Sequence, residues 1–83
     1  MRRMRLESSL LDWVLYRDDR QILDVWFRTG KKYRYFAVPE TCYRELLSAE
    51  SAGRFFNATI RNQYAYKDLS RPSAPLILAS FPK

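Results

Sequence analysis

Residues 21–40 read QILDVWFRTGKKYRYFAVPE, and this stretch decides the fold. Within it, residues 21–28 and 32–38 each alternate with the two-residue period of a β-strand. Residues 29–31 separate the two runs, and Gly30 among them can adopt the positive φ angle that short hairpin loops often require. The stretch therefore predicts two antiparallel strands joined by a tight connection.

A further strand is expected immediately before this hairpin. Residues 9–16 form an apolar and aromatic run that Asp12 interrupts, and its length favours a strand with a bulge. The polar residues 17–20 then form the turn that leads into the hairpin. Together the three runs predict an antiparallel β-meander.

Two helices are expected after the meander. Pro39 ends the third strand and suits the first turn of a helix, because its missing N–H has no partner to lose there. Apolar residues follow it at i+4, i+7 and i+8 and form a stripe to face the sheet, namely Tyr43, Leu46 and Leu47. Ser51 is the expected N-cap of a second helix over residues 52–62. We therefore predict an α+β fold of order β-β-β-α-α, a three-stranded antiparallel meander followed by two α-helices packed on one face.

The composition indicates one small folded domain with a basic surface. The chain has 83 residues, of which 47% are hydrophobic, so it can bury one core and is too apolar for intrinsic disorder. Lys and Arg number 15 against 9 Asp and Glu, and the net charge of +6 favours polyanionic partners. No apolar run approaches the length of a membrane span, so no membrane partner is expected.

The chain lacks histidine and has a single cysteine, Cys42, so most enzyme classes lose their usual catalytic group. Cys42 alone cannot form an internal disulfide or a zinc site, and its spacing to Leu46 and Ala49 favours a small buried residue over a nucleophile. Asp18 and Asp19 lie in an expected turn, where they give no support for paired catalytic carboxylates. We expect a cytoplasmic protein that is not an enzyme and needs no cofactor and no metal.

Residues 8–67 are expected to form the domain, between a basic leader over residues 1–7 and a tail over residues 68–83. Polar residues interrupt the apolar run behind the leader, which argues against a secretory signal. In the tail, Pro72 and Pro75 belong to a linker before four large apolar residues, Leu76, Ile77, Leu78 and Phe81. We expect this apolar patch to pair with an open sheet edge, in its own chain or in a twofold mate.

A set of residues within the expected domain resembles the KTSC domain. The set comprises Ser8-Ser9, Tyr16, Leu23-Asp24-Val25-Trp26-Phe27, Gly30, Tyr33-Arg34-Tyr35, Val38-Pro39, Ala49, Ser51, Gly53, Phe55-Phe56-Asn57, Ile60-Arg61 and Tyr64. The KTSC domain is a small domain of bacteria and phages, found alone and at the carboxyl end of some lysyl-tRNA synthetases, with a central Tyr-x-Tyr as its hallmark. The resemblance implies RNA binding through the synthetase context.

The hairpin supplies a first candidate binding surface. Trp26, Tyr33 and Tyr35 are expected to share one sheet face, where aromatic rings can stack on unpaired bases. Basic residues accompany them in the same hairpin and are candidate phosphate contacts, namely Arg28, Lys31, Lys32 and Arg34. The alternative is that the two tyrosines pack against the second helix or the tail as ordinary core residues.

The second helix supplies another candidate surface. Its N-terminus at Ser51 and Gly53 is followed by Arg54, Asn57 and Arg61, whose spacing of i, i+3 and i+7 places them on one helical stripe that can meet a phosphate. Tyr64, a residue of the family pattern, is included with them. Alternatively the helix is simply capped, its arginines pair with acids elsewhere or stay solvated, and Asn57 holds a neighbouring loop.

These observations predict a binding module for RNA or single-stranded nucleic acid. The alternative is a protein-interaction adaptor or a homo-oligomeric module that uses the aromatic sheet face as its interface. Ionic strength separates the two, because phosphate binding weakens steeply with salt and an aromatic interface does not.

Overall fold

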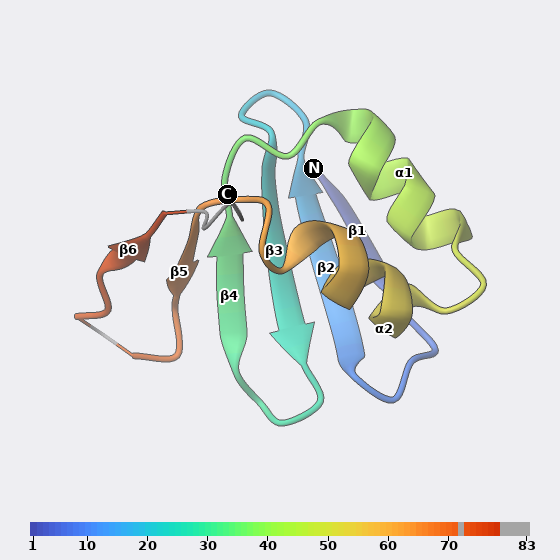
Figure 1. Cartoon of the computed structure of the whole chain (residues 1–83), viewed down its shortest axis with the longest axis horizontal. Helices are drawn as coiled ribbons and strands as arrows, with labels where there is room; N and C mark the ends of the chain where they lie inside the picture. Colours follow the sequence, from blue (N-terminus) through green and yellow to red (C-terminus); the bar gives the residue numbers. More distant parts are fainter. Residues whose placement is uncertain (72, 79–83) are drawn as a thin grey trace.

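Six antiparallel strands in chain order form one sheet in the computed structural model, which describes residues 1–71 and 73–78 (Figure 1). The strands are β1 (Arg2–Arg5), β2 (Leu11–Arg17), β3 (Ile22–Phe27), β4 (Lys32–Tyr35), β5 (Tyr66–Asp68) and β6 (Leu76–Ile77). The chain therefore adds each strand to the edge that the previous strand leaves open.

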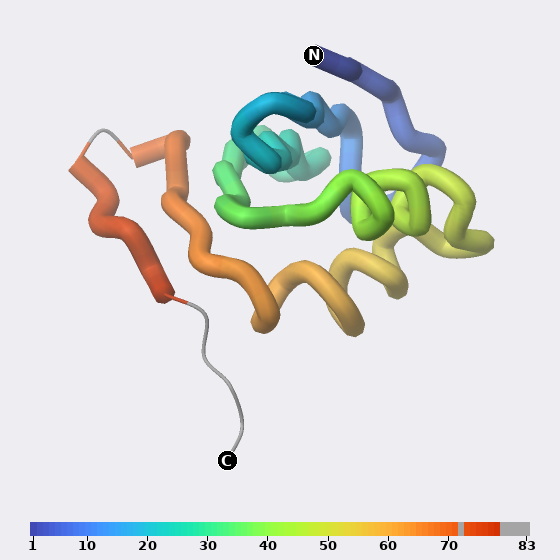
Figure 2. The backbone as a smooth tube through the Cα atoms, turned by 90° about the horizontal axis from the view of Figure 1, so that it is seen from above, coloured from blue at the N-terminus to red at the C-terminus, as the bar shows by residue number. Residues whose placement is uncertain are grey.

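The helical segments interrupt this order between β4 and β5. They are α1 (Glu40–Ser48), α2 (Ala52–Phe55) and η1 (Phe56–Ile60), a π-helical turn that continues α2. All three lie on one side of the sheet, which we call the helix face (Figures 1 and 2). We call the other side the open face, because none of the described elements covers it.

The core lies between the helix face and the helices. Tyr16 of β2 and Tyr43 of α1 stack with ring centroids 4.8 Å apart, and the Tyr16 hydroxyl donates a 2.6 Å hydrogen bond to the carbonyl of Val38. Phe56 of η1 meets Tyr35 of β4 edge to face at 5.5 Å. Aromatic contacts of this kind join α1 and η1 to the sheet.

The connection between β3 and β4 fixes which side chains share a face. Gly30 donates to the Phe27 carbonyl at 2.9 Å, and Phe27 donates to the Lys31 carbonyl at 2.8 Å, so residues 28–30 form a three-residue loop. Gly30 has φ of 97°, the left-handed conformation that such loops require. The resulting register places Val25 opposite Tyr33.

The α+β fold, the two helices on one face and the order of the central elements agree with the prediction. The sheet is larger than the predicted three-stranded meander, because β1, β5 and β6 extend it. β1 lies in the expected leader, where an arginine-rich segment gives no strand pattern. β4 ends at Tyr35 instead of residue 38, since Ala37 adopts φ of 57° and breaks the extended backbone.

Arg2 holds the edge strand β1 against the rest of the domain. Its guanidinium forms ion pairs with Asp18 at 2.6 Å and Glu40 at 2.9 Å. The same group lies over the rings of Tyr16 and Tyr43, 5.6 and 5.2 Å from their centroids. Tertiary contacts therefore stabilise a strand that its own sequence does not favour.

Leu76 and Ile77 of the tail do pair with a sheet edge, as expected, but the edge belongs to β5. Their side chains stay 51% and 40% exposed, so the pairing buries little apolar surface. Two other residues of the predicted tail, Pro72 and Phe81, lie outside the described residues.

Replacing Gly30 with Ala should lower the free energy of unfolding by about 1 kcal/mol, because the left-handed backbone is strained for a residue with a Cβ atom. The added Cβ atom would not clash with a neighbour, since no atom lies within 4 Å of it. Urea denaturation measures the loss. Gly30→Asn should lose less, because asparagine tolerates positive φ better than alanine. Equal stability of the Ala variant and the parent would show that the turn does not require glycine.

Candidate nucleic-acid interface

Two tryptophans lie side by side on the open face. Trp13 of β2 is paired directly with Trp26 of β3, and both rings are half-buried. Together with Arg3 they line a shallow hollow of about 340 Å³. We call the open face of the sheet, which carries these two rings, the tryptophan face.

Cations contact both tryptophan rings. The guanidiniums of Arg3 and Arg5 each lie 5.7 Å from the Trp13 centroid, and the Lys32 ammonium lies 4.4 Å from that of Trp26. Each pair is within cation–π distance. The strands that supply these cations, β1 and β4, flank the two tryptophan strands, so positive charge borders the rings on both sides.

A buried carboxylate organises two further arginines on the tryptophan face. Asp24 is 0% exposed and accepts hydrogen bonds from Arg34 at 2.8 and 3.1 Å and from Arg17 at 3.3 Å. The hydrogen bond with Asp24 raises the pKa of Arg34, which keeps the guanidinium charged. By strand register, the tryptophan face carries six cations: Arg3, Arg5, Arg17, Lys32, Arg34 and Lys67.

The prediction that Trp26, Tyr33 and Tyr35 share a face is wrong. In the β3–β4 register the partners of Tyr33 and Tyr35 are Val25 and Leu23, which both belong to the core. Cross-strand partners lie on the same side of a sheet, so the two tyrosines belong to the helix face. Tyr35 is only 1% exposed beneath Phe56, which matches the alternative that it packs against the second helix.

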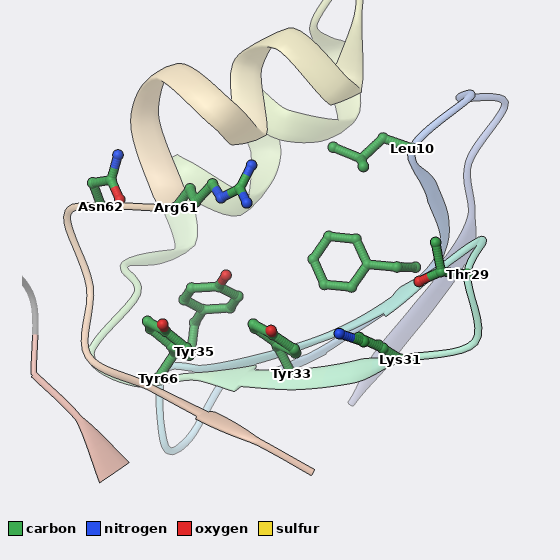
Figure 3. A pocket seen from close by; sticks show the side chains of 9 residues that line it. Leu10, Thr29, Lys31, Tyr33, Tyr35, Arg61, Asn62 and Tyr66 are labelled. Carbon is green, nitrogen blue, oxygen red and sulfur yellow. The ribbon is translucent and has the colours of Figure 1, made fainter. Parts of the chain in front are cut away.

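Beyond the end of η1 the tyrosines line a cavity of about 250 Å³ (Figure 3), which we call the tyrosine pocket. Its aromatic lining comes from three strands, as Phe27, Tyr33, Tyr35 and Tyr66. Figure 3 shows Arg61 reaching over the tyrosine rings from the helical segment, while Lys31 approaches from the β3–β4 loop. Four predicted site residues therefore meet here, namely Lys31, Tyr33, Tyr35 and Arg61.

The tyrosine pocket carries positive charge and neutral phenols. Burial and the neighbouring tyrosines raise the pKa of Tyr35, and the Arg61 charge opposes this shift only in part. The phenol therefore stays protonated at neutral pH and can donate a hydrogen bond. Arg61 donates to the Asn57 amide oxygen at 3.2 Å, which holds its guanidinium in place.

The residues predicted at the second helix do not all border one hollow, although Arg61 and Asn57 are hydrogen-bonded to each other. Arg54 and Asn57 border a hollow beside Ser51, whereas Arg61 borders the tyrosine pocket. The π-helical turn η1 is the reason, because its wider turn means that a separation of seven residues no longer returns to the same stripe. Ser51 caps the helix as predicted, accepting a 3.3 Å hydrogen bond from the Arg54 amide.

The packing of the chain explains why residue 53 is a glycine. A Cβ atom there would lie 3.3 Å from the Ser8 hydroxyl oxygen and 3.4 Å from the Leu10 Cβ. Residues 8–10 thus pack directly on the start of α2, and Arg28 fastens the same segment by donating to the Ser8 carbonyl at 2.5 Å. The segment that lies close to Gly53 is therefore part of the protein itself.

Tyr64 and Cys42 form a contact away from both surfaces. Cys42 is 4% exposed, and burial raises the pKa of its thiol. Burial and a hydrogen bond with the thiol raise the pKa of Tyr64 to about 12. Cys42 is therefore a buried packing residue, as its spacing predicted.

Several residues of these surfaces escaped the sequence analysis. Trp13, Arg3 and Arg5 lie on the tryptophan face, and Phe27 and Tyr66 line the tyrosine pocket. Alternation along β2 places Trp13 on the opposite face from the buried Val14, but the sequence alone does not show which of the two is buried, since both are apolar.

The described residues also limit the chemistry. Among residues 1–71 and 73–78, no three His, Cys, Asp or Glu side chains are grouped so that they could hold a metal ion. Within the same ranges, no helix has the length and apolar character needed to cross a membrane.

The fold and its surfaces define a small α+β domain with helices on one side of an antiparallel sheet and a basic, tryptophan-bearing surface on the other. The model of the KTSC domain family matches residues 7–64, and the chain belongs to this family. This membership confirms the resemblance found in the sequence.

Relatives of the chain include both separate small proteins and parts of a larger one. It is 44% identical over 64 residues to an uncharacterized protein from Stutzerimonas stutzeri, covering 77% of this chain and 90% of the relative. A lysine–tRNA ligase from Nostoc sp. is 36% identical over 67 residues, which are 81% of this chain and 12% of the ligase. A solved KTSC domain protein from Yersinia pestis has a TM-score of 0.77 at 31% identity, covering 81% of this chain and 94% of that one.

Labelling of Cys42 with a thiol reagent at about pH 8 should be much slower in the folded protein than in urea, because the raised pKa leaves less thiolate and burial blocks access. Absorbance of the released reagent measures the rate. A Cys42→Ala variant that carries Ser48→Cys, at an exposed position on the same helix, provides the fast reference. Equal rates for the folded parent and this reference would mean that the thiol is accessible and reactive.

Proposed function

We propose that this domain binds single-stranded nucleic acid, RNA in particular, on the tryptophan face and catalyses no reaction. The observation that carries the proposal is the cross-strand pair of Trp13 and Trp26 on an uncovered sheet face, with cations at both rings. Aromatic rings hold unpaired bases by stacking, without reading their sequence.

The geometry suits a strand of nucleotides laid across the sheet. Neighbouring β-strands lie roughly 4.8 Å apart, so the two indoles offer adjacent stacking positions. Lys32, Arg3 and Arg5 have flexible side chains that can move from the ring faces to phosphates when bases take their place. A duplex keeps its bases stacked inside, which favours single strands as the ligand.

The charge on the tryptophan face supports the same ligand. Within residues 1–71 and 73–78, two carboxylates contact the six cations of this face. Asp24 is buried and bonded to Arg17 and Arg34, and Asp12, at the register shift between Leu11 and Trp13, lies 3.8 Å from Arg5. A phosphate backbone therefore meets cations on every strand from β1 to β5 except β3. One relative, the Nostoc ligase, is named for a reaction on tRNA, and a module that binds RNA is compatible with that name.

A protein interface on the same surface is the second candidate. Leu76, Ile77 and Leu78 are 51%, 40% and 73% exposed at the β6 edge, and Leu76 shares the open face by its register with Lys67. A partner protein or a second copy could cover them together with the tryptophans. Such an interface would depend on apolar contact and would survive salt.

Trp13→Leu and Trp26→Leu should each weaken the binding of a fluorescently labelled uridine decamer about tenfold, because stacking on one aromatic ring contributes roughly 1 to 3 kcal/mol. Fluorescence anisotropy measures the affinity, and raised salt should weaken it further. Trp13→Phe and Trp26→Phe retain a ring and should recover most of the affinity.

Controls for this experiment lie within the same chain. Arg44→Gln removes a charge from an exposed position of α1 on the other side of the sheet and should leave decamer binding unchanged. Because the chain has only two tryptophans, both on the tryptophan face, bound RNA should also quench the intrinsic fluorescence of the parent. A parent protein that neither binds the decamer nor changes fluorescence, and that forms a salt-resistant dimer in light scattering, would favour the interface instead.

A further inference from the structure

The tyrosine pocket lies on the opposite side of the sheet from the tryptophan face and is bordered by Arg61 and Asn62 at the end of the helical segment (Figure 3). We infer that the tyrosine pocket binds a nucleoside monophosphate, with the planar base against the tyrosine rings and the phosphate at Arg61 and Lys31. This inference uses different residues from the proposed function and does not rest on it.

The aromatic lining forms a continuous row across three strands. Tyr33 and Tyr66 stack with centroids 5.3 Å apart and an interplanar angle of 5°, and Phe27 meets Tyr33 edge to face at 5.3 Å. At the inner end of the row, the ring centroids of Tyr35 and Tyr66 are 5.5 Å apart. The facing sides of Tyr33 and Tyr66 cover each other, so a planar base meets the edges and the outer faces of this packed row.

The cations determine the charge of the ligand. Arg61 and Lys31 are both exposed, and they are the two charged residues among the lining of the tyrosine pocket. In the described part of the chain, no carboxylate lies within ion-pair distance of Arg61, which donates a hydrogen bond to the neutral Asn57 amide. The guanidinium therefore keeps donors for an anion, and phosphate accepts hydrogen bonds from arginine in a favourable paired geometry.

The size of the tyrosine pocket fits one nucleotide unit, free or at the end of a strand. Its 250 Å³ lies just under the range of about 300 to 1,000 Å³ that is usual for sites holding drug-sized molecules. The side chains of Thr29 and Asn62 add hydrogen-bonding groups at opposite ends, suited to the polar edge of a base or to a sugar hydroxyl.

The nucleotide can be free or can be the phosphorylated end of a strand, because both present the same base and phosphate. Adenosine 5′-monophosphate and an adenosine tetranucleotide with a 5′-phosphate separate these sources. Binding of the free nucleotide indicates a small-molecule site, and binding of the tetranucleotide alone indicates a site for strand ends. Binding of neither overturns the inference.

Isothermal titration with the full chain tests the chemistry. Adenosine and ribose 5-phosphate each lack one half of the ligand and should bind at least about tenfold more weakly than the monophosphate. Arg61→Gln should weaken monophosphate binding by about tenfold or more and leave adenosine binding nearly unchanged, since it removes a charge-assisted contact to phosphate. Arg54→Gln is the matched control, because Arg54 is exposed on the same helical segment but borders a different hollow.

Two further results keep this inference separate from the proposed function. Arg61→Gln should leave decamer binding and tryptophan quenching intact, while Trp13→Leu should leave monophosphate binding intact, because the sheet lies between the two surfaces. Equal monophosphate affinities of the parent and Arg61→Gln, with both proteins folded by circular dichroism, would overturn the inference. Equal affinities for adenosine and its monophosphate would overturn it as well.

Discussion

The pairing of β3 with β4 is the constraint on which both surfaces depend. The three-residue loop between these strands pairs Phe27 with Lys31, Val25 with Tyr33, and Trp26 with Lys32. A loop with one residue more or fewer would place Trp26 among the tyrosines and turn the core residues of β4 to the open face. The tyrosine pocket and the tryptophan face thus follow from one register.

The parity of that register could have been predicted from the sequence. The expected connection over residues 29–31 and the observed loop over 28–30 both contain three residues, and either one pairs odd-numbered residues with odd-numbered residues. Tyr33 would face Val25 or Phe27 in both cases, and never Trp26. The length of the loop therefore places the two tyrosines on the same face as Val25 and on the opposite face from Trp26. Their aromatic character alone does not distinguish them from Trp26.

Other features depend on contacts between distant parts of the chain, so local patterns could not reveal them. The RRMR sequence of β1 has no apolar alternation, and Arg2 secures it by pairing with Asp18 and Glu40. β5 has only three residues, too few for a periodic signal. Gly53 belongs to the second candidate surface, but its neighbour is Ser8, whose position near this helix only the folded chain defines. The long alternating strands and the striped helix α1 were predictable because local sequence and tertiary packing agree there.

The position of the helices explains why one sheet surface carries polar chemistry. α1, α2 and η1 leave the sheet after β4, and the chain returns at the neighbouring strand β5, so all helical cover falls on one side. The strands then have one buried face and one solvated face, which is the usual condition of an antiparallel sheet. Among the described residues, Arg3, Arg5 and Lys32 of the neighbouring strands lie against the tryptophan rings, which stay half-buried.

Asp24 has a consequence for the entropy of any association at the tryptophan face. Its hydrogen bonds hold Arg17 and Arg34 in defined rotamers, so these two long side chains lose conformational freedom when the protein folds and have less to lose on meeting a ligand. The carboxylate cancels part of their charge and weakens long-range attraction in return. Arg17 and Arg34 are thus preorganised, while Arg3, Arg5 and Lys32 are held by cation–π contacts and, for Arg5, by a 3.8 Å ion pair with Asp12, and can rearrange when a ligand approaches.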